Sequence, residues 1–111
     1  MGVTVRNIIP AKLAESAQTA QYTANGCKTI IDTFTVVNVG AANASISINL
    51  VPKSGTAAPN NLITVTRSVA PGQSWRASEV IGHVLEDGGF ISTLASTATD
   101  LSIRATGREI V

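Results

Sequence analysis

Alternation of apolar and polar residues predicts β-strands along most of the chain. The clearest case is residues 44–51, ASISINLV, in which apolar side chains alternate with Ser and Asn. A period of two is typical of a strand with one buried and one solvated face. Further strand-like runs rich in β-branched residues occupy residues 29–39, 62–69, 90–96 and 101–111.

Turn signals separate these runs. Asn25-Gly26 is a strong hairpin signal, because both residues tolerate a positive φ, and the small residues at 39–44 predict a turn between two antiparallel strands. Residues 52–61, PKSGTAAPNN, predict an exposed loop, and Pro71-Gly72 fits a type II turn. The helix-like segment is residues 78–85, SEVIGHVL, which begins with a potential N-cap serine.

About seven short strands with turns at intervals of roughly 8–12 residues predict an all-β fold. The expected architecture is an antiparallel β-sandwich, either Ig-like or a jelly roll. One short helical turn near residues 78–85 is expected within it. We expect a single sandwich domain over residues 11–111, preceded by an N-terminal arm at residues 1–10. Residues 109–111, EIV, form a second apolar terminal arm.

The run TIIDTFTVVNV at residues 29–39 raises a question, because its apolar residues do not all fall on one face. Phe34 and Val36 point one way, whereas Ile31, Val37 and Val39 point the other way. The N-terminal segment could cover this second face, a bulge could reverse the facing midway, or another copy of the chain could cover it. Exposed Ile and Val would forgo several kcal/mol of burial, at roughly 1.5–3 kcal/mol per side chain.

The third explanation, together with the apolar arms, predicts a homo-oligomer, with a trimer as one option. The residues expected at the assembly interface are Val3, Val5, Ile8, Ile9, Ile31, Val37, Val39 and Trp75.

Composition and charge exclude some classes of binding partner. Charged residues make up 14% of the sequence, and the formal net charge is +1. A duplex-binding surface needs clustered Lys and Arg, so nucleic acid is not an expected partner. No apolar run approaches the ~20 residues needed to cross a bilayer, and no secretory signal is visible. We therefore expect a soluble chain, made in the cytoplasm, without a membrane partner.

Side chains that could support chemistry are few. His83 is the single histidine and has no metal-ligand spacing to another residue. Glu86-Asp87 fit an exposed turn, and Cys27 fits a small buried residue. Asp32 is expected to face solvent or to pair with an arginine such as Arg104. The sequence predicts no catalytic residue, no metal site and no cofactor.

Six segments carry a resemblance to a known group of proteins. They are YTANG (22–26), TIIDTFTVVNVG (29–40), SISINLVPKSGTA (45–57), SVAPGQSW (68–75), EVIGHVLEDGGFISTLAS (79–96) and LSIRATGREI (101–110). Together they resemble small virion structural proteins of tailed bacteriophages. These motifs consist mostly of turn and core residues, so they specify a fold better than a role, and they assign no functional residue.

The resemblance implies a non-enzymatic structural protein located in the virion. Its expected partners are further copies of itself and the major capsid protein or other virion proteins. Capsid decoration or cement is favoured slightly over a neck, tail or baseplate position. The alternative is a host-receptor or carbohydrate-binding adhesion module that uses Trp75 and the loop 52–61. An exposed Trp75-Arg76 pair would offer a surface on which a sugar ring could stack.

Overall fold

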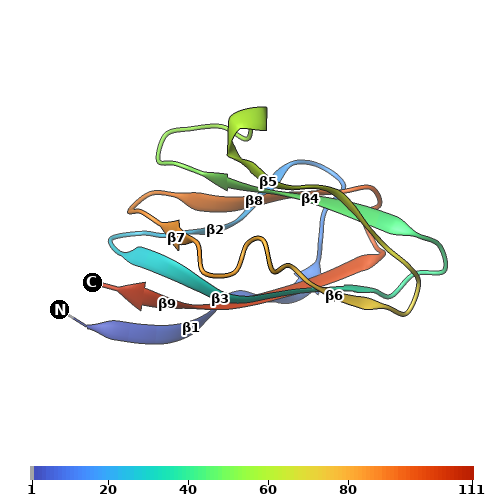
Figure 1. Cartoon of the computed structure of the whole chain (residues 1–111), viewed down its shortest axis with the longest axis horizontal. Helices are drawn as coiled ribbons and strands as arrows, with labels where there is room; N and C mark the ends of the chain where they lie inside the picture. The colour runs from blue at the N-terminus through green and yellow to red at the C-terminus, as the bar shows by residue number, and fades with distance from the viewer. Residues whose placement is uncertain (1) are drawn as a thin grey trace.

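Nine strands and one 3₁₀ turn form the regular structure of residues 2–111, the part of the chain that the computed structural model describes (Figure 1). The strands are β1 (Val3–Leu13), β2 (Thr19–Thr23), β3 (Lys28–Asn38), β4 (Ala44–Val51), β5 (Leu62–Val69), β6 (Ser74–Arg76), β7 (Val84–Leu85), β8 (Phe90–Ala95) and β9 (Leu101–Ile110). The 3₁₀ turn η1 spans Pro59–Asn61.

The strands form two antiparallel sheets that face each other. The first sheet, sheet A, has the order β1-β9-β3-β6, and β7 also pairs with β3; the second, sheet B, has the order β2-β8-β4-β5. The short strands β6 and β7 pair with successive parts of β3, so they share one edge position. With that position counted once, eight strands are arranged as in a jelly roll. The predicted all-β sandwich is confirmed, and of its two variants the chain adopts the jelly roll.

Consecutive strands at the start of this fold lie in opposite sheets. The turn at Asn25-Gly26 follows β2 of sheet B and leads to β3 of sheet A. Residues 39–43 then connect β3 to β4 in sheet B. Both turns exist as predicted, and Gly26 has a φ of 72°. The antiparallel pairings expected across them are wrong, because each turn crosses from one sheet to the other.

A bulge in β3 answers the question of its two apolar faces. Between Ile31 and Thr33 the register with β9 shifts, so Asp32 is an extra residue in the strand. An extra residue reverses which side chains point inward. Ile31 before the bulge and Phe34 after it therefore both lie in the core, with no exposed surface.

The helical turn predicted near residues 78–85 is not present. Ser78–Gly82 form turns, and Val84 and Leu85 form strand β7. This segment bonds to β3 at intervals, since the Ala77 N–H donates to the Phe34 carbonyl and the Gly82 N–H to the Ile31 carbonyl. These bonds, with a positive φ of 88° at Gly82, prevent a helix. The helical turn of the structure is η1, within the loop predicted at 52–61.

The N-terminal segment is part of the sandwich. β1 pairs with β9 from Val3 to Leu13, so the boundary expected between residues 10 and 11 falls inside a strand. Ile8 and Ile9 are buried in the common core. The expected arm is therefore wrong as a separate unit: a strand whose inner half fills the core cannot be detached from the domain. Only its first residues extend past the body, beside the end of β9 (Figure 1).

Candidate assembly surface

The structure divides the eight predicted interface residues into buried and accessible positions. Ile8, Ile9 and Ile31 are 5%, 0% and 0% exposed, in the chain's own core. Their assignment to an interface is corrected, because the jelly roll packs them between its two sheets. Val37 and Trp75 are half-buried, and Val3, Val5 and Val39 are exposed.

The accessible members do not form one surface. Val3 and Val5 lie at the end of sheet A where both chain termini emerge, opposite Ile110 and Arg108 of β9. Val39 follows the other end of β3, where its N–H donates to the carbonyl of Asp100. A single interface on one molecule therefore includes either the valines of β1 or Val39.

Cross-strand register extends the β1 valines into a larger apolar area. Val5 lies opposite Arg108, which lies opposite Ile30, which in turn lies opposite Val84 of β7. Side chains at directly opposed positions share one face of a sheet, and here it is the outer face of sheet A. Val3 and Ile110 form the next row. We call Val3, Val5, Ile30, Val84 and Ile110 the terminal patch.

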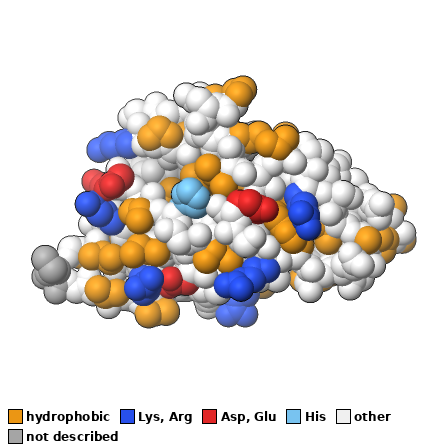
Figure 2. All heavy atoms as spheres, in the orientation of Figure 1, with side chains coloured by type: hydrophobic (Ala, Val, Ile, Leu, Met, Phe, Trp, Pro, Cys, Tyr) orange, Lys and Arg blue, Asp and Glu red, His pale blue; other side chains and the backbone are white. Residues whose placement is uncertain are grey.

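Much of the terminal patch is exposed to solvent although its side chains are apolar. Val3 and Val5 retain 60% and 75% of their accessible surface, and Val84 retains 49%. Figure 2 shows hydrophobic side chains gathered at this end of the molecule, with Lys and Arg around them. Sequence reasoning missed Ile30, Val84 and Ile110, because only the register of four separate strands brings them beside the valines.

Arg108 lies within the patch, between Val5 and Ile30, and forms an ion pair with Asp32. The Arg108 guanidinium donates from Nε and Nη2 to the Asp32 carboxylate at 3.0–3.2 Å. This bond raises the pKa of Arg108. The prediction that Asp32 faces solvent or pairs with an arginine is confirmed, and the partner is Arg108. Arg104 instead donates to Asn7 at 3.1 Å.

A polar contact joins the two sheets behind the patch. The Tyr22 hydroxyl of sheet B donates to the Glu109 carboxylate of sheet A and is 2.7 Å from the Thr29 hydroxyl. Burial and the hydrogen bond to Glu109 raise the pKa of Tyr22. Arg6 pairs with the other carboxylate oxygen of Glu109 at 3.2 Å. The first residues of β1 are therefore fixed to the sandwich through side chains as well as through the backbone.

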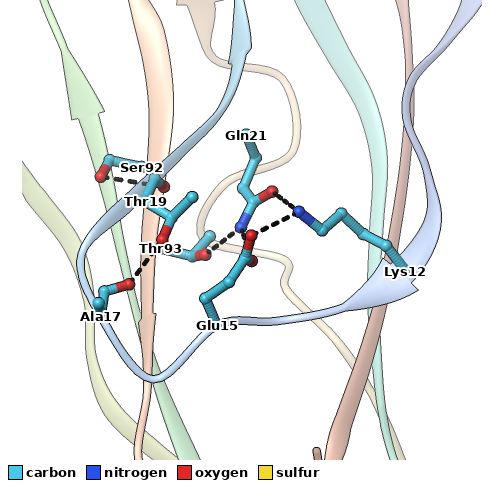
Figure 3. A network of polar contacts seen from close by, with 7 residues as sticks. All are labelled: Lys12, Glu15, Ala17, Thr19, Gln21, Ser92 and Thr93. Atoms are coloured by element: carbon cyan, nitrogen blue, oxygen red, sulfur yellow. Dashed lines mark hydrogen bonds and ion pairs between the residues drawn. The ribbon is translucent and has the colours of Figure 1, made fainter. Parts of the chain in front are cut away.

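A second network holds the crossing from β1 to β2 (Figure 3). The Lys12 ammonium donates to Glu15 at 2.9 Å and to Gln21 at 2.8 Å. Gln21 donates in turn to Glu15 at 2.9 Å and to the buried Thr93 hydroxyl at 3.0 Å. The hydrogen bonds from Gln21 and Lys12 lower the pKa of the Glu15 carboxyl. This network closes the side of the sandwich between the two sheets.

The remaining candidates for chemistry lie apart from one another. His83 is exposed. Asp87 accepts a hydrogen bond from the Gly26 N–H at 2.8 Å, as a turn residue. Cys27 is buried and contacts Thr29. Within residues 2–111, no group of three His, Cys, Asp or Glu side chains could hold a metal ion, and no helix is long and apolar enough to span a membrane.

Trp75 is partly covered by its neighbours. The Arg67 guanidinium lies 4.9 Å from the centre of the indole ring, in cation–π geometry. Arg67 rather than Arg76 is therefore its charged partner, and that ring face is not free to stack on a sugar. The loop 52–61 lies at the opposite end of the sandwich from β6 (Figure 1). Trp75 and this loop do not form a common site.

Comparison with known proteins supports the fold. No family model and no curated protein matches the chain. Among solved structures, the chain is similar to one from the disulfide-linked pili that form Bacillus endospore appendages, with a TM-score of 0.55 and 12% identity over 98% of this chain and 88% of that chain. It is also similar to a chain of infectious bursal disease virus, Gx strain, with a TM-score of 0.56 and 11% identity.

The viral match covers 99% of this chain but 32% of the viral one, so our chain spans about a third of that protein. At these identities the two likenesses show a shared β-sandwich fold and nothing finer. The chain has the architecture of a pilus chain and of part of a viral chain.

Proposed function

We propose that the protein is a non-enzymatic structural subunit of a bacteriophage virion that assembles with copies of itself. Within the virion we favour capsid decoration or cement over a neck, tail or baseplate position, as the sequence resemblance suggests. Its partners are then its own copies and the major capsid protein or another virion protein.

The terminal patch is the observation that carries this proposal. Exposed apolar side chains gathered at one end of a small protein indicate an interaction surface. The chain carries few charged residues, so electrostatic repulsion between copies is weak. Subunits of a repeating particle need contacts of modest strength, because symmetry multiplies each one.

The structural neighbours support the same direction. One belongs to a pilus and the other to a virus, and both therefore come from assemblies. The bacteriophage assignment itself depends on the resemblance of the six sequence segments.

Self-association is tested by sedimentation velocity and light scattering over a wide range of concentrations. We expect oligomers for the wild type and weaker association for Val5→Thr, which removes apolar surface from the terminal patch. Val65→Thr is the matched control, because Val65 is similarly exposed at 66% but lies on edge strand β5 of the other sheet. A wild type that stays monomeric at every concentration would contradict the proposal.

Location is tested on purified particles. We expect mass spectrometry to find the protein in stoichiometric amounts, and an electron-microscopy reconstruction to resolve it on the head. Density on the neck or tail would retain the structural role and reject the decoration role.

The adhesion alternative has its own test. A glycan array that binds the wild type but not Trp75→Ala would favour it. The cover of Trp75 by Arg67 leads us to expect no such binding.

A further inference from the structure

Three of the four sheet edges are interrupted. β5 shifts register twice against β4, and Thr66 within it has a left-handed φ of 45°. β2 has five residues and a register shift of its own. The β6/β7 edge is broken by the turns that follow Ala77. Bulges, short strands and breaks prevent another strand from pairing at an exposed edge.

The fourth edge, β1, is interrupted only in its second half. Its register with β9 shifts on both sides of Ile9, and Pro10 lacks an N–H. From Val3 to Arg6, by contrast, the pairing with β9 is regular. This segment is thus a regular strand with one side unpaired.

The backbone groups on that free side can be identified. Gly2 and Val111 exchange two hydrogen bonds, of 3.3 and 3.0 Å, so they form a hydrogen-bonded pair. Such pairs alternate along an antiparallel ladder. Thr4 and Arg6 therefore direct their N–H and C=O groups toward β9. Val3 and Val5 direct theirs away from the sheet.

We propose that two copies join through this edge. The inference rests on the proposed assembly of the protein with itself. The two β1 strands run antiparallel about a two-fold axis at Thr4, so that Val3 of each copy lies opposite Val5 of the partner subunit. Four hydrogen bonds then form between the outward groups of Val3 and Val5, and sheet A continues from one copy into the next.

The sequence of the segment is complementary to itself in this register. Gly2–Arg6 is centred on Thr4, so no residue of the regular segment is left without an opposite. Arg6 lies opposite Gly2 of the partner subunit, and no like charges meet across the edge. Because Val3 and Val5 belong to the terminal patch, the two patches become one apolar surface. A register shifted by two residues toward the C-terminus would place Val3 opposite Asn7, where β1 leaves regular pairing.

Val5→Pro tests the edge directly. Proline removes the outward N–H and is tolerated at a strand edge where that N–H faces solvent. We expect a folded variant, by far-ultraviolet circular dichroism, with a dissociation constant raised about tenfold or more, since two intersubunit hydrogen bonds are lost by symmetry. Thr4→Pro is the control. It removes an N–H that bonds to β9, so it lowers the unfolding midpoint instead.

Cross-linking tests the register without relying on proline. Thr4→Cys, made together with Cys27→Ser, places two thiols opposite each other in a non-hydrogen-bonded pair, about 4.5 Å apart at Cα. That separation suits a disulfide. Oxidation with copper phenanthroline should yield a covalent dimer on a non-reducing gel. Arg6→Cys in the same background should not, because its opposite residue is Gly2.

The outcomes separate the two proposals. Weaker association of Val5→Pro together with cross-linking of Thr4→Cys supports the β1 edge. An oligomer that survives Val5→Pro, with no Thr4→Cys cross-link, overturns the edge inference and leaves the structural role standing. A wild type that never associates overturns both.

Discussion

The Ile31→Ala substitution tests whether the bulge at Asp32 places Ile31 in the core. Ile31 has no exposed surface, so the change removes three buried carbon groups. At about 0.8 kcal/mol for each group, the transfer contribution is roughly 2.4 kcal/mol. The cavity left behind adds to it, because cores collapse only partly, and the total falls at about 2–5 kcal/mol. This is a large share of the roughly 5–15 kcal/mol that stabilises a typical domain.

Urea unfolding at a protein concentration where the chain is monomeric is the appropriate assay. For a loss of about 3 kcal/mol and an m-value of about 1.5 kcal/mol/M, the midpoint moves down by roughly 2 M. Val37→Ala is the matched control on the same strand, half-buried on the outer face, and should cost less than about 1 kcal/mol. If Ile31→Ala leaves the midpoint unchanged but dissociates oligomers, the core position argued for Ile31 is refuted.

Three further predictions concern other parts of the fold. Because the pKa of Tyr22 is raised in the folded state, the unfolded chain loses the tyrosine proton at a lower pH than the folded chain. The free energy of unfolding should therefore fall above pH about 10, by at most about 1.4 kcal/mol per pH unit, and this fall should be smaller in Tyr22→Phe. The lowered pKa of Glu15 contributes stability that is present above pH about 4.5 and lost in acid; Glu15→Gln should flatten that loss in thermal melts from pH 3 to 6. Gly107→Ala would bring a Cβ to 2.6 Å from the Ile30 carbonyl oxygen, so calorimetry should show a loss of about 1–3 kcal/mol, whereas Gly2→Ala, with nothing within 4 Å, should be neutral.

Strand positions were predictable because burial and alternation are local. The runs at 44–51, 62–69 and 90–96 correspond to β4, β5 and β8 within a residue or so. The turn at Pro71-Gly72 was equally visible, and Gly72 has the positive φ of 75° that a type II turn requires.

Pairing was not predictable from those same signals. A turn such as Asn25-Gly26 allows the chain to reverse, but the sheet that receives the next strand depends on contacts distant in sequence. The extra residue at Asp32 is also invisible locally, since its effect appears only when β3 is aligned with β9. Ile31 was therefore assigned to the wrong face by counting in steps of two.

The candidate surface was predictable in part. Val3 and Val5 stood out as apolar residues near a chain end, and they remain accessible. Ile8 and Ile9 follow them after Arg6 and Asn7, and alternation alone does not show which of the two apolar pairs is buried. The separation arises from the register shifts of β1, which turn the strand toward the core after Arg6.

The two outer faces of the sandwich differ in a way that orients any assembly. On sheet B, Ser45 lies opposite Ser68 and Ser47 opposite Leu94, so serines surround single exposed apolar side chains there. Such a face stays hydrated at little cost and forms few strong contacts. Sheet A presents the terminal patch and the free edge of β1. Because both lie at one end of one sheet, the proposed self-association uses that end, and we expect the Ser-rich face of sheet B to point toward solvent in the assembled particle.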